Sequence, residues 1–293
     1  MAGHTRPHFI LFGSSIVQFS FSHEGWGAIL ADLYSRKVIS SSYRGWNSRR
    51  ALEVLDKVFP KDAIVQPSLV ILYFGGNDAS LPHPSGIGPH VPLDVFVENM
   101  KKIALHLKSL SDSTRVIFLS CPPVNEEQVR ETMGKNVLKS NVTCKMYSDA
   151  CVELCHEMDV KVVDLFNVIR RHNGWLSTCF TDGVHLTSEG SKVVVEEILK
   201  VLSDANWEPS LHWKSMPTEF DEDSPYYCVG PDGITAKNLS HVPLSWQEPW
   251  TNSDCFAKPT ALLALCYFSI NPFNVPGWLL ALIALMHLRN NYK

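Results

Sequence analysis

The chain has 293 residues, of which 45% are hydrophobic, and a formal net charge of -4. This length and hydrophobic share allow a full buried core and favour one large domain, with or without an extension. Because no basic run occurs, we expect neither nucleic acid nor an anionic membrane surface as a partner. The apolar stretch near the N-terminus, residues 9–12, is too short for the core of a signal peptide. We therefore expect a cytoplasmic protein whose cysteines are mostly reduced.

Short apolar runs bounded by turn residues predict β-strands. The runs are residues 9–12 (FILF), 68–74 (SLVILYF), 114–120 (TRVIFLS) and 160–166 (VKVVDLF). Continuous apolar runs of this length are typical of strands that are buried on both faces of a parallel sheet.

Segments with helical spacing of their apolar residues lie between these runs. They cover residues 26–34, 48–59, 93–110, about 138–158 and 188–202, and the last one opens with Ser188 as its capping residue. Strand and helix therefore alternate from residue 8 to about 202. This alternation predicts an α/β fold, a three-layer α/β/α sandwich around a mostly parallel, doubly wound sheet.

The composition of the chain changes after residue 205. We expect residues 1–205 to form the α/β domain and residues 206–250, rich in proline, aromatic and acidic residues, to be an extended segment wrapped on it. Residues 251–293 form an atypical apolar tail, in which 259–288 contain no Asp, Glu, Lys or Arg. Its two apolar runs are each shorter than the roughly 20 residues that a spanning helix needs. We favour a poorly packed variant tail, with a membrane-associating hairpin or anchor and a buried helical pair as the alternatives.

Four motifs lie at predicted junctions between strands and helices. Ser14 and Ser15 follow the first strand and GGND (75–78) follows the second, whereas RGWNSR (44–49) and TDGVH (181–185) precede helices. Each motif alone reads more simply as a turn, a helix cap or a surface pair. Ligands of open α/β sheets bind outside the carboxyl ends of the strands, and all four motifs fall on that predicted edge. We therefore interpret them together as one catalytic site.

These motifs supply the parts of an acyl-transfer site. A serine hydroxyl is a weak nucleophile without a base, and His185 has the right titration range to activate Ser15. We expect Asp182 to fix the tautomer of His185 and to stabilise the imidazolium. The backbone N–H groups of Ser15 and Gly45 and the side-chain amide of Asn77 are the expected oxyanion donors.

At these residues the sequence resembles the SGNH, or GDSL-type, hydrolase family, which is marked by four blocks carrying Ser, Gly, Asn and His. The matching blocks are LFGSSIVQ, YRGWNSRRAL, YFGGND and FTDGVHLTSEG. Stretches such as GWGAILADLYSRK and WEPSLHWKSMPTEFDEDSPY are similar to the plant-type isoamyl-acetate-hydrolysing-esterase-like branch of the family. The resemblance extends over about residues 7–250.

The resemblance implies an SGNH hydrolase, flavodoxin-like fold and a serine esterase or lipase that acts on carboxylic esters, with short-chain acyl or acetyl esters favoured. It implies no cofactor and no metal, and the expected partner is a small-molecule ester. Membrane association is expected only through residues 259–288. The first alternative is a catalytically impaired binding protein, because the loop SSYRG before Trp46 lacks one glycine that relatives have and places Arg44 beside Gly45. The second alternative is a membrane-associated variant directed by the apolar tail.

Other motifs have a structural and a functional interpretation. Cys144, Cys151 and Cys155 fall on one predicted helix, and we expect buried thiols there because a zinc site needs about four converging ligands. Trp26 and Trp46 line either the acyl pocket or the core, and we favour the core for Trp26. The Pro/Gly-rich loop 82–90 either shapes the substrate site or is a simple connection.

Overall fold

The computed structural model describes residues 7–22, 24–34, 38–83, 85–134 and 139–216. The predicted tail 251–293 and residues 217–250 of the predicted extended segment lie outside these ranges. The strands are β1 (Phe9–Gly13), β2 (Val38–Ser42), β3 (Leu69–Tyr73), β4 (Arg115–Leu119) and β5 (Lys161–Val163). The longer helices are α2 (Trp26–Tyr34), α3 (Ser48–Val58), α4 (Leu93–Lys108), α5 (Glu126–Met133), α6 (Asn141–Glu157), α7 (Leu165–Arg171) and α9 (Ser188–Asp204). Short helical segments are α1 (Ser15–Gln18), α8 (Trp175–Thr178) and two 3-10 helices, Phe19–Phe21 and Trp213–Ser215.

The five strands form one parallel sheet in the order β2-β1-β3-β4-β5. The chain therefore moves outward from β1 in one direction to β2, and then crosses back to build β3, β4 and β5 on the other side. This reversal confirms the predicted doubly wound fold. It also places the topological switch point, where ligands of such sheets bind, at the carboxyl ends of β1 and β3.

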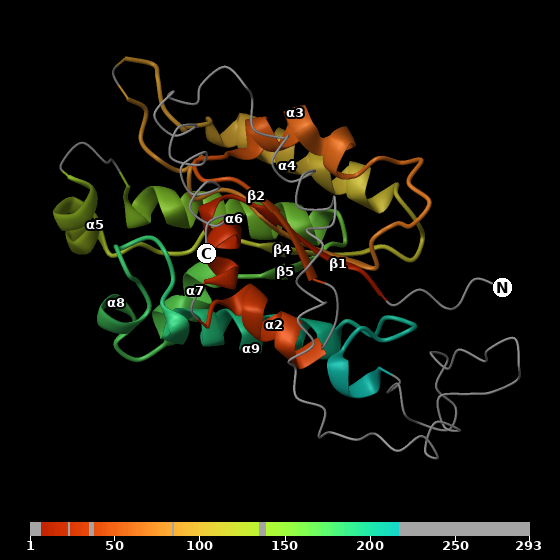
Figure 1. The fold of residues 1–293 in the computed structure, drawn as a ribbon. Coiled ribbons are helices and arrows are strands. Elements are labelled where there is room, and N and C mark those ends of the chain that lie inside the picture. The colour runs from red at the N-terminus through yellow and green to blue at the C-terminus, as the bar shows by residue number, and fades with distance from the viewer. Residues whose placement is uncertain (1–6, 23, 35–37, 84, 135–138, 217–293) are drawn as a thin grey trace, which may run out of the picture. The chain divides into compact units, whose positions relative to one another are not determined.

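Helices cover both faces of this sheet, which makes the three layers of the predicted sandwich. In Figure 1, α3, α4 and α6 lie on one side of the strands and α2 and α9 on the other. Side chains of β3 alternate between the two cores, because Val70 and Leu72 pack in the first and Leu69, Ile71 and Tyr73 in the second. Burial on both faces explains why this strand reads as one continuous apolar run.

The structure adds β2, a strand that the sequence did not predict. Its sequence, VISSS, is not a continuous apolar run. In the described part of the chain, β2 is the edge strand and pairs with β1 alone, and Ser41 and Ser42 remain partly exposed. An edge strand therefore lacks the double burial on which the sequence criterion relied.

The predicted strand 160–166 is wrong at its C-terminal end. β5 ends at Val163, and α7 begins two residues later at Leu165. The side chain of Asp164 accepts a hydrogen bond from Asn167 N at 3.1 Å, so Asp164 caps the helix. The apolar residues that follow Asp164 thus belong to a buried helix rather than to the strand.

The predicted thiol face on helix 138–158 is confirmed. Cys144, Cys151 and Cys155 of α6 are buried free cysteines. Trp46 lies between its two predicted environments, because it packs partly buried against the core and stacks on Tyr43 with ring centroids 4.5 Å apart. Within the described ranges, no helix combines the length and the apolar character that crossing a bilayer requires.

Helix α9 begins at Ser188 as predicted, but the capping residue is Thr187. The Thr187 hydroxyl oxygen accepts a hydrogen bond from Gly190 N at 3.1 Å. This cap fixes the start of a helix that follows the TDGVH motif directly.

Replacing Thr187 by alanine is expected to lower the free energy of unfolding by about 1 kcal/mol, because Gly190 N–H loses its acceptor. Urea denaturation of the full chain measures the change. Thr187→Ser is the matched control and is expected to keep most of the stability, since it retains the hydroxyl. An equal loss in both variants would show that the threonine methyl group, rather than the cap, is responsible.

Candidate active site

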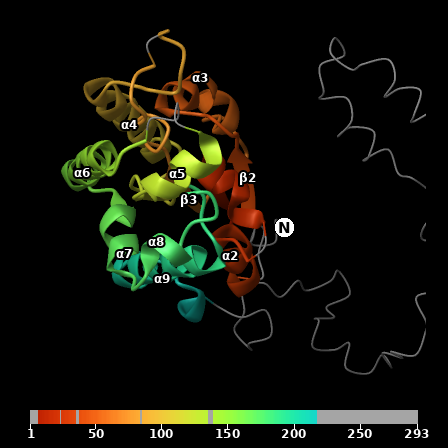
Figure 2. The same ribbon diagram turned by 90° about the vertical axis from the view of Figure 1, so that its left-hand side faces the viewer.

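The predicted site residues come together at the carboxyl edge of the sheet, which faces the viewer in Figure 2. Ser15 is the first residue of α1 and comes two residues after the end of β1. Gly45 follows β2 and Asn77 follows β3, and these are the two strands that pair with β1. The two predicted oxyanion residues therefore come from the strands on either side of the strand that leads to Ser15.

Hydrogen bonds join the three residues predicted as a triad. The distance from His185 Nε2 to Ser15 Oγ is 2.9 Å, and that from His185 Nδ1 to Asp182 Oδ2 is 2.6 Å. The other carboxylate oxygen of Asp182 accepts the backbone N–H groups of Val184 and His185 at 3.0 and 2.9 Å. Asp182 is thus held by its own loop in an orientation that presents one oxygen to the imidazole.

These contacts determine the charge state of Asp182. Burial opposes ionisation, but hydrogen bonds from the ring and backbone of His185 and from the Val184 N–H outweigh it and lower the pKa of Asp182 to about 2. Asp182 is therefore an anion at neutral pH and accepts the proton of His185 Nδ1. In this tautomer the lone pair of His185 Nε2 accepts a hydrogen bond from the Ser15 hydroxyl group.

Two aromatic side chains that the sequence did not assign to the site support Ser15 and His185. Trp26, buried in α2, donates its indole N–H to the carbonyl oxygen of Ile16 at 3.1 Å, one residue beyond Ser15. Phe19 lies edge-to-face against the His185 ring, with centroids 4.9 Å apart. The turn that carries Ser15 and the imidazole of His185 each contact an aromatic ring from the segment that follows β1.

Among the described residues, the side-chain amide of Asn77 donates one hydrogen bond, which leaves its second amide hydrogen without an acceptor there. Asn77 Nδ2 donates to the backbone carbonyl oxygen of Trp46 at 2.8 Å. This contact links the loop after β3 to the loop that contains Gly45. Gly45 has a φ of +83°, in the left-handed region that favours glycine, and an added Cβ would have no neighbour within 4 Å. Backbone conformation rather than crowding therefore explains the glycine.

The aspartate of the GGND motif has a structural role that the sequence did not reveal. Asp78 is fully buried and accepts hydrogen bonds from Gly75 N at 3.2 Å and Ser48 N at 2.9 Å. Burial raises its pKa, and the hydrogen bonds from Ser48 oppose this effect. Asp78 ties the loop that carries Asn77 to the first residue of α3.

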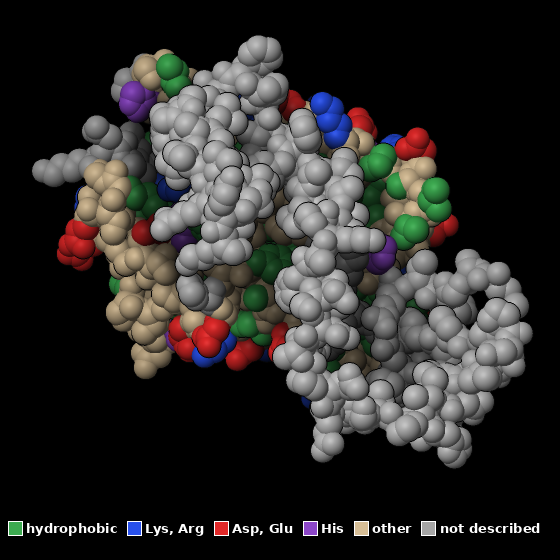
Figure 3. All heavy atoms as spheres, viewed as in Figure 1, with side chains coloured by type: hydrophobic (Ala, Val, Ile, Leu, Met, Phe, Trp, Pro, Cys, Tyr) green, Lys and Arg blue, Asp and Glu red, His purple; other side chains and the backbone are tan. Residues whose placement is uncertain are grey.

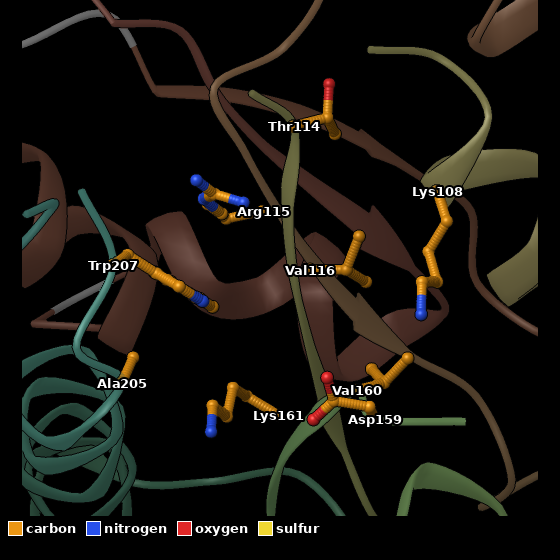
Figure 4. A pocket seen from close by; sticks show the side chains of 9 residues that line it. All are labelled: Lys108, Thr114, Arg115, Val116, Asp159, Val160, Lys161, Ala205 and Trp207. Atoms are coloured by element: carbon orange, nitrogen blue, oxygen red, sulfur yellow. The ribbon is translucent and has the colours of Figure 1, made fainter. Parts of the chain in front are cut away.

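A cavity of about 330 Å³ lies at the amino edge of the sheet, opposite the predicted catalytic residues (Figure 4). Its lining includes Arg115 and Lys161, which are the first residues of β4 and β5. Two of its cations already bind backbone oxygens. Lys108 donates to Met158 O at 2.8 Å, and Arg115 donates to Asp112 O and Glu208 O at 3.3 Å. This cavity is separate from the predicted catalytic residues.

On the face in Figure 3, described acidic and basic side chains are interspersed.

The fold and the joined Ser, His and Asp side chains define a hydrolase of the SGNH type. The sequence model of the GDSL-like Lipase/Acylhydrolase family matches residues 11–193, which is more than half of the chain. The chain belongs to this family. The match confirms the resemblance predicted from the four motifs and the enzyme class, a carboxylic ester hydrolase.

Individual relatives agree with this assignment. GDSL esterase/lipase CPRD49 of Arabidopsis thaliana is 60% identical over 255 residues, which cover 85% of this chain and 100% of the relative. Isoamyl acetate-hydrolyzing esterase 1 homolog of Rattus norvegicus is 33% identical over 193 residues, 64% of this chain and 77% of the relative. A solved lipase/acylhydrolase from Enterococcus faecalis has the same fold, with a TM-score of 0.53 at 20% identity over 68% of this chain and 97% of its own.

The low pKa of Asp182 predicts a pH-dependent contribution to stability. Its ionised form stabilises the folded state above the unfolded pKa near 3.8, and this contribution is lost as the pH falls towards 2. We expect Asp182→Asn to lower the free energy of unfolding by about 1 kcal/mol at neutral pH, after allowance for solvent screening of the partly exposed side chain. The difference from the wild type should shrink as the pH approaches 2.

Urea denaturation at several pH values measures this difference. Asp149→Asn, on the exposed face of α6, is the matched control, because it removes a carboxylate that pairs only with the exposed Lys145. A difference between Asp182→Asn and the wild type that stays constant with pH would contradict the assigned cause.

Proposed function

We propose that this chain is a serine esterase in which Ser15, His185 and Asp182 act as the catalytic triad. The oxyanion donors of the proposal are the backbone N–H groups of Ser15 and Gly45 and the side-chain amide of Asn77. The observation that carries the proposal is the continuous pair of hydrogen bonds from Ser15 to His185 and from His185 to Asp182. We also propose residues 1–205 as the catalytic domain, which the family match over 11–193 supports.

The first half of the proposed reaction forms an acyl-enzyme. Ser15 Oγ attacks the carbonyl carbon of the ester while its proton passes to Nε2 of His185. Asp182, already an anion, stabilises the imidazolium through the hydrogen bond from Nδ1. The imidazolium then gives the proton to the departing alkoxide, so that the alcohol leaves and the acyl group remains on Ser15.

The negative charge of the tetrahedral intermediate develops on the former carbonyl oxygen. Donors that are fixed beforehand stabilise this charge without reorganising during the reaction. The second amide hydrogen of Asn77, which has no acceptor among the described residues, meets this requirement, since the Trp46 carbonyl holds the side chain through the other one. In the second half, His185 takes a proton from water while the water oxygen attacks the acyl carbon. The imidazolium then returns this proton to Ser15 Oγ as the bond from Oγ to the acyl carbon breaks, which releases the acid and restores the free enzyme. Transfer to another alcohol would follow the same steps.

We propose acetyl or other short-chain acyl esters as the substrates. The rat relative is named as an isoamyl acetate-hydrolyzing esterase homolog, and this name supports extending the preference to the present chain. Exposed apolar rings lie beside the proposed catalytic residues: Phe19, which contacts His185, is 37% exposed, and Tyr43, two residues before Gly45, is 58% exposed. These rings suit a small apolar alcohol or acyl group.

The nucleophile can be tested on the full chain with p-nitrophenyl esters from acetate to octanoate. We expect hydrolysis that is fastest for the shorter esters, and Ser15→Ala should lower kcat by at least about 1,000-fold because the acyl-enzyme no longer forms. A fluorophosphonate probe should label the wild type and leave Ser15→Ala unlabelled. A wild-type rate no higher than that of Ser15→Ala on every ester, together with no labelling, would contradict the esterase and favour the binding protein.

The oxyanion donor can be tested separately. Asn77→Ala is expected to lower kcat by about 100-fold or more and to change KM little, because the lost hydrogen bond forms mainly in the transition state. Thermal melting verifies that the variant is folded. An unchanged kcat in a folded variant would exclude Asn77 from the oxyanion hole.

A further inference from the structure

We propose that Lys139 is a positioning residue that holds Asn77 in place to bind the oxyanion. This inference rests on the function proposed above for Asn77. Lys139 lies two residues before α6, far along the chain from the loop after β3. It belongs to none of the four sequence motifs, and nothing in its sequence neighbourhood predicts a role in the site.

The Lys139 ammonium group binds the loop on both sides of Asn77. Its Nζ donates to the carbonyl oxygen of Gly76 at 2.6 Å and to the hydroxyl oxygen of Ser80 at 3.2 Å. Ser80 N in turn donates to Asn77 O at 3.1 Å. One amine therefore connects the residue before Asn77 to the residue that closes the turn after it.

The peptide unit between Gly76 and Asn77 is the critical one. The Gly76 carbonyl, which Lys139 binds, and the Asn77 N–H belong to the same rigid plane. The hydroxyl group of Tyr73, a residue that is buried at the end of β3, lies against Gly76, because a Cβ added there would clash with Tyr73 Oη. Lys139 therefore binds a residue that is also closely packed, and a rotation of its peptide plane would displace Asn77.

The side chain of Asn77 has its own support, so the two sets of contacts are complementary. The Trp46 carbonyl sets the direction of the amide at 2.8 Å, whereas Lys139 sets the backbone from which that amide projects. Positioning errors of about 1 Å in a catalytic group can cost about 100-fold in rate. A contact that fixes the backbone at this point therefore affects catalysis without touching the substrate.

Burying the ammonium group of Lys139 costs folding free energy unless hydrogen bonds compensate for the lost water. Its side chain is partly buried, and burial lowers its pKa, while Cys144, Cys121, Asp78 and Asp182 act in the opposite direction. Among the described residues, no carboxylate lies within ion-pair distance of its Nζ. A cation that is removed from water without a paired anion needs strong hydrogen bonds to be tolerated, and the two oxygens of the Asn77 loop provide them.

A double-mutant cycle tests the inference on the full chain. Lys139→Met is expected to lower kcat by about tenfold to 100-fold with KM within about twofold of the wild type. If Lys139 acts through Asn77, Lys139→Met should add no further loss when Asn77 is already alanine. The inference would be overturned if Lys139→Met lowered kcat by the same factor in the Asn77→Ala background as in the wild type.

Other variants separate positioning from structure. Lys139→Arg and Lys139→Gln each retain a donor for the Gly76 carbonyl and are expected to recover part of the lost kcat. Lys145→Met is the matched control: it removes an exposed lysine of α6 that pairs with Asp149, and it should behave as the wild type. Unfolding of every Lys139 variant in a thermal melt would assign a purely structural role and would also overturn the inference.

The same assay includes the wild type and Ser15→Ala. Wild-type hydrolysis that is absent or equal to that of Ser15→Ala contradicts the proposed function itself. An active wild type with an equally active Lys139→Met overturns only the role of Lys139. The two failures are therefore distinguishable.

Discussion

The parallel pairing of β1 with both β2 and β3 is the constraint on which the rest of the site depends. Because the chain winds away from β1 in two directions, the loops after these three strands open side by side at one edge of the sheet. Gly45 and Asn77 lie in two of these loops, and Ser15 is the first residue of the short helix that follows β1. Residues that are widely separated in the sequence thus reach one place through strand order alone, and the loop before α9 adds Asp182 and His185.

A layer of buried polar contacts then fixes the loops that the strands bring together. Asp78 joins the loop after β3 to α3, Trp26 joins the turn after β1 to α2, and the Trp46 carbonyl joins the Asn77 side chain to the loop after β2. Each contact connects a loop to an element of a different part of the chain. Rigid loops are what preorganised catalysis requires, since donors that must first move into place stabilise a transition state less.

The sequence predicted what depends on local patterns. Doubly buried strands appeared as apolar runs, and the residues of the Ser15–His185–Asp182 contacts stood in recognisable motifs. The sequence did not predict β2, because an edge strand needs no continuous apolar run. It assigned the residues after Asp164 to a strand, whereas Asp164 caps a helix that begins there. Trp26, Phe19, Asp78 and Lys139 have site contacts that arise only from tertiary packing, and each residue type is common in ordinary cores or surfaces.

The hydrogen bond between Ser15 and His185 joins residues 170 positions apart. During translation, Ser15 leaves the ribosome early, whereas His185 leaves only after nearly all of the domain has been synthesised. Contacts between such distant residues form late, because the intervening chain must first be ordered. During synthesis the nascent domain thus holds Ser15 without its hydrogen-bond partner until the segment around His185 has emerged and folded. Under the proposed mechanism, hydrolytic competence would arrive in one late step, and incomplete chains would carry an inert serine.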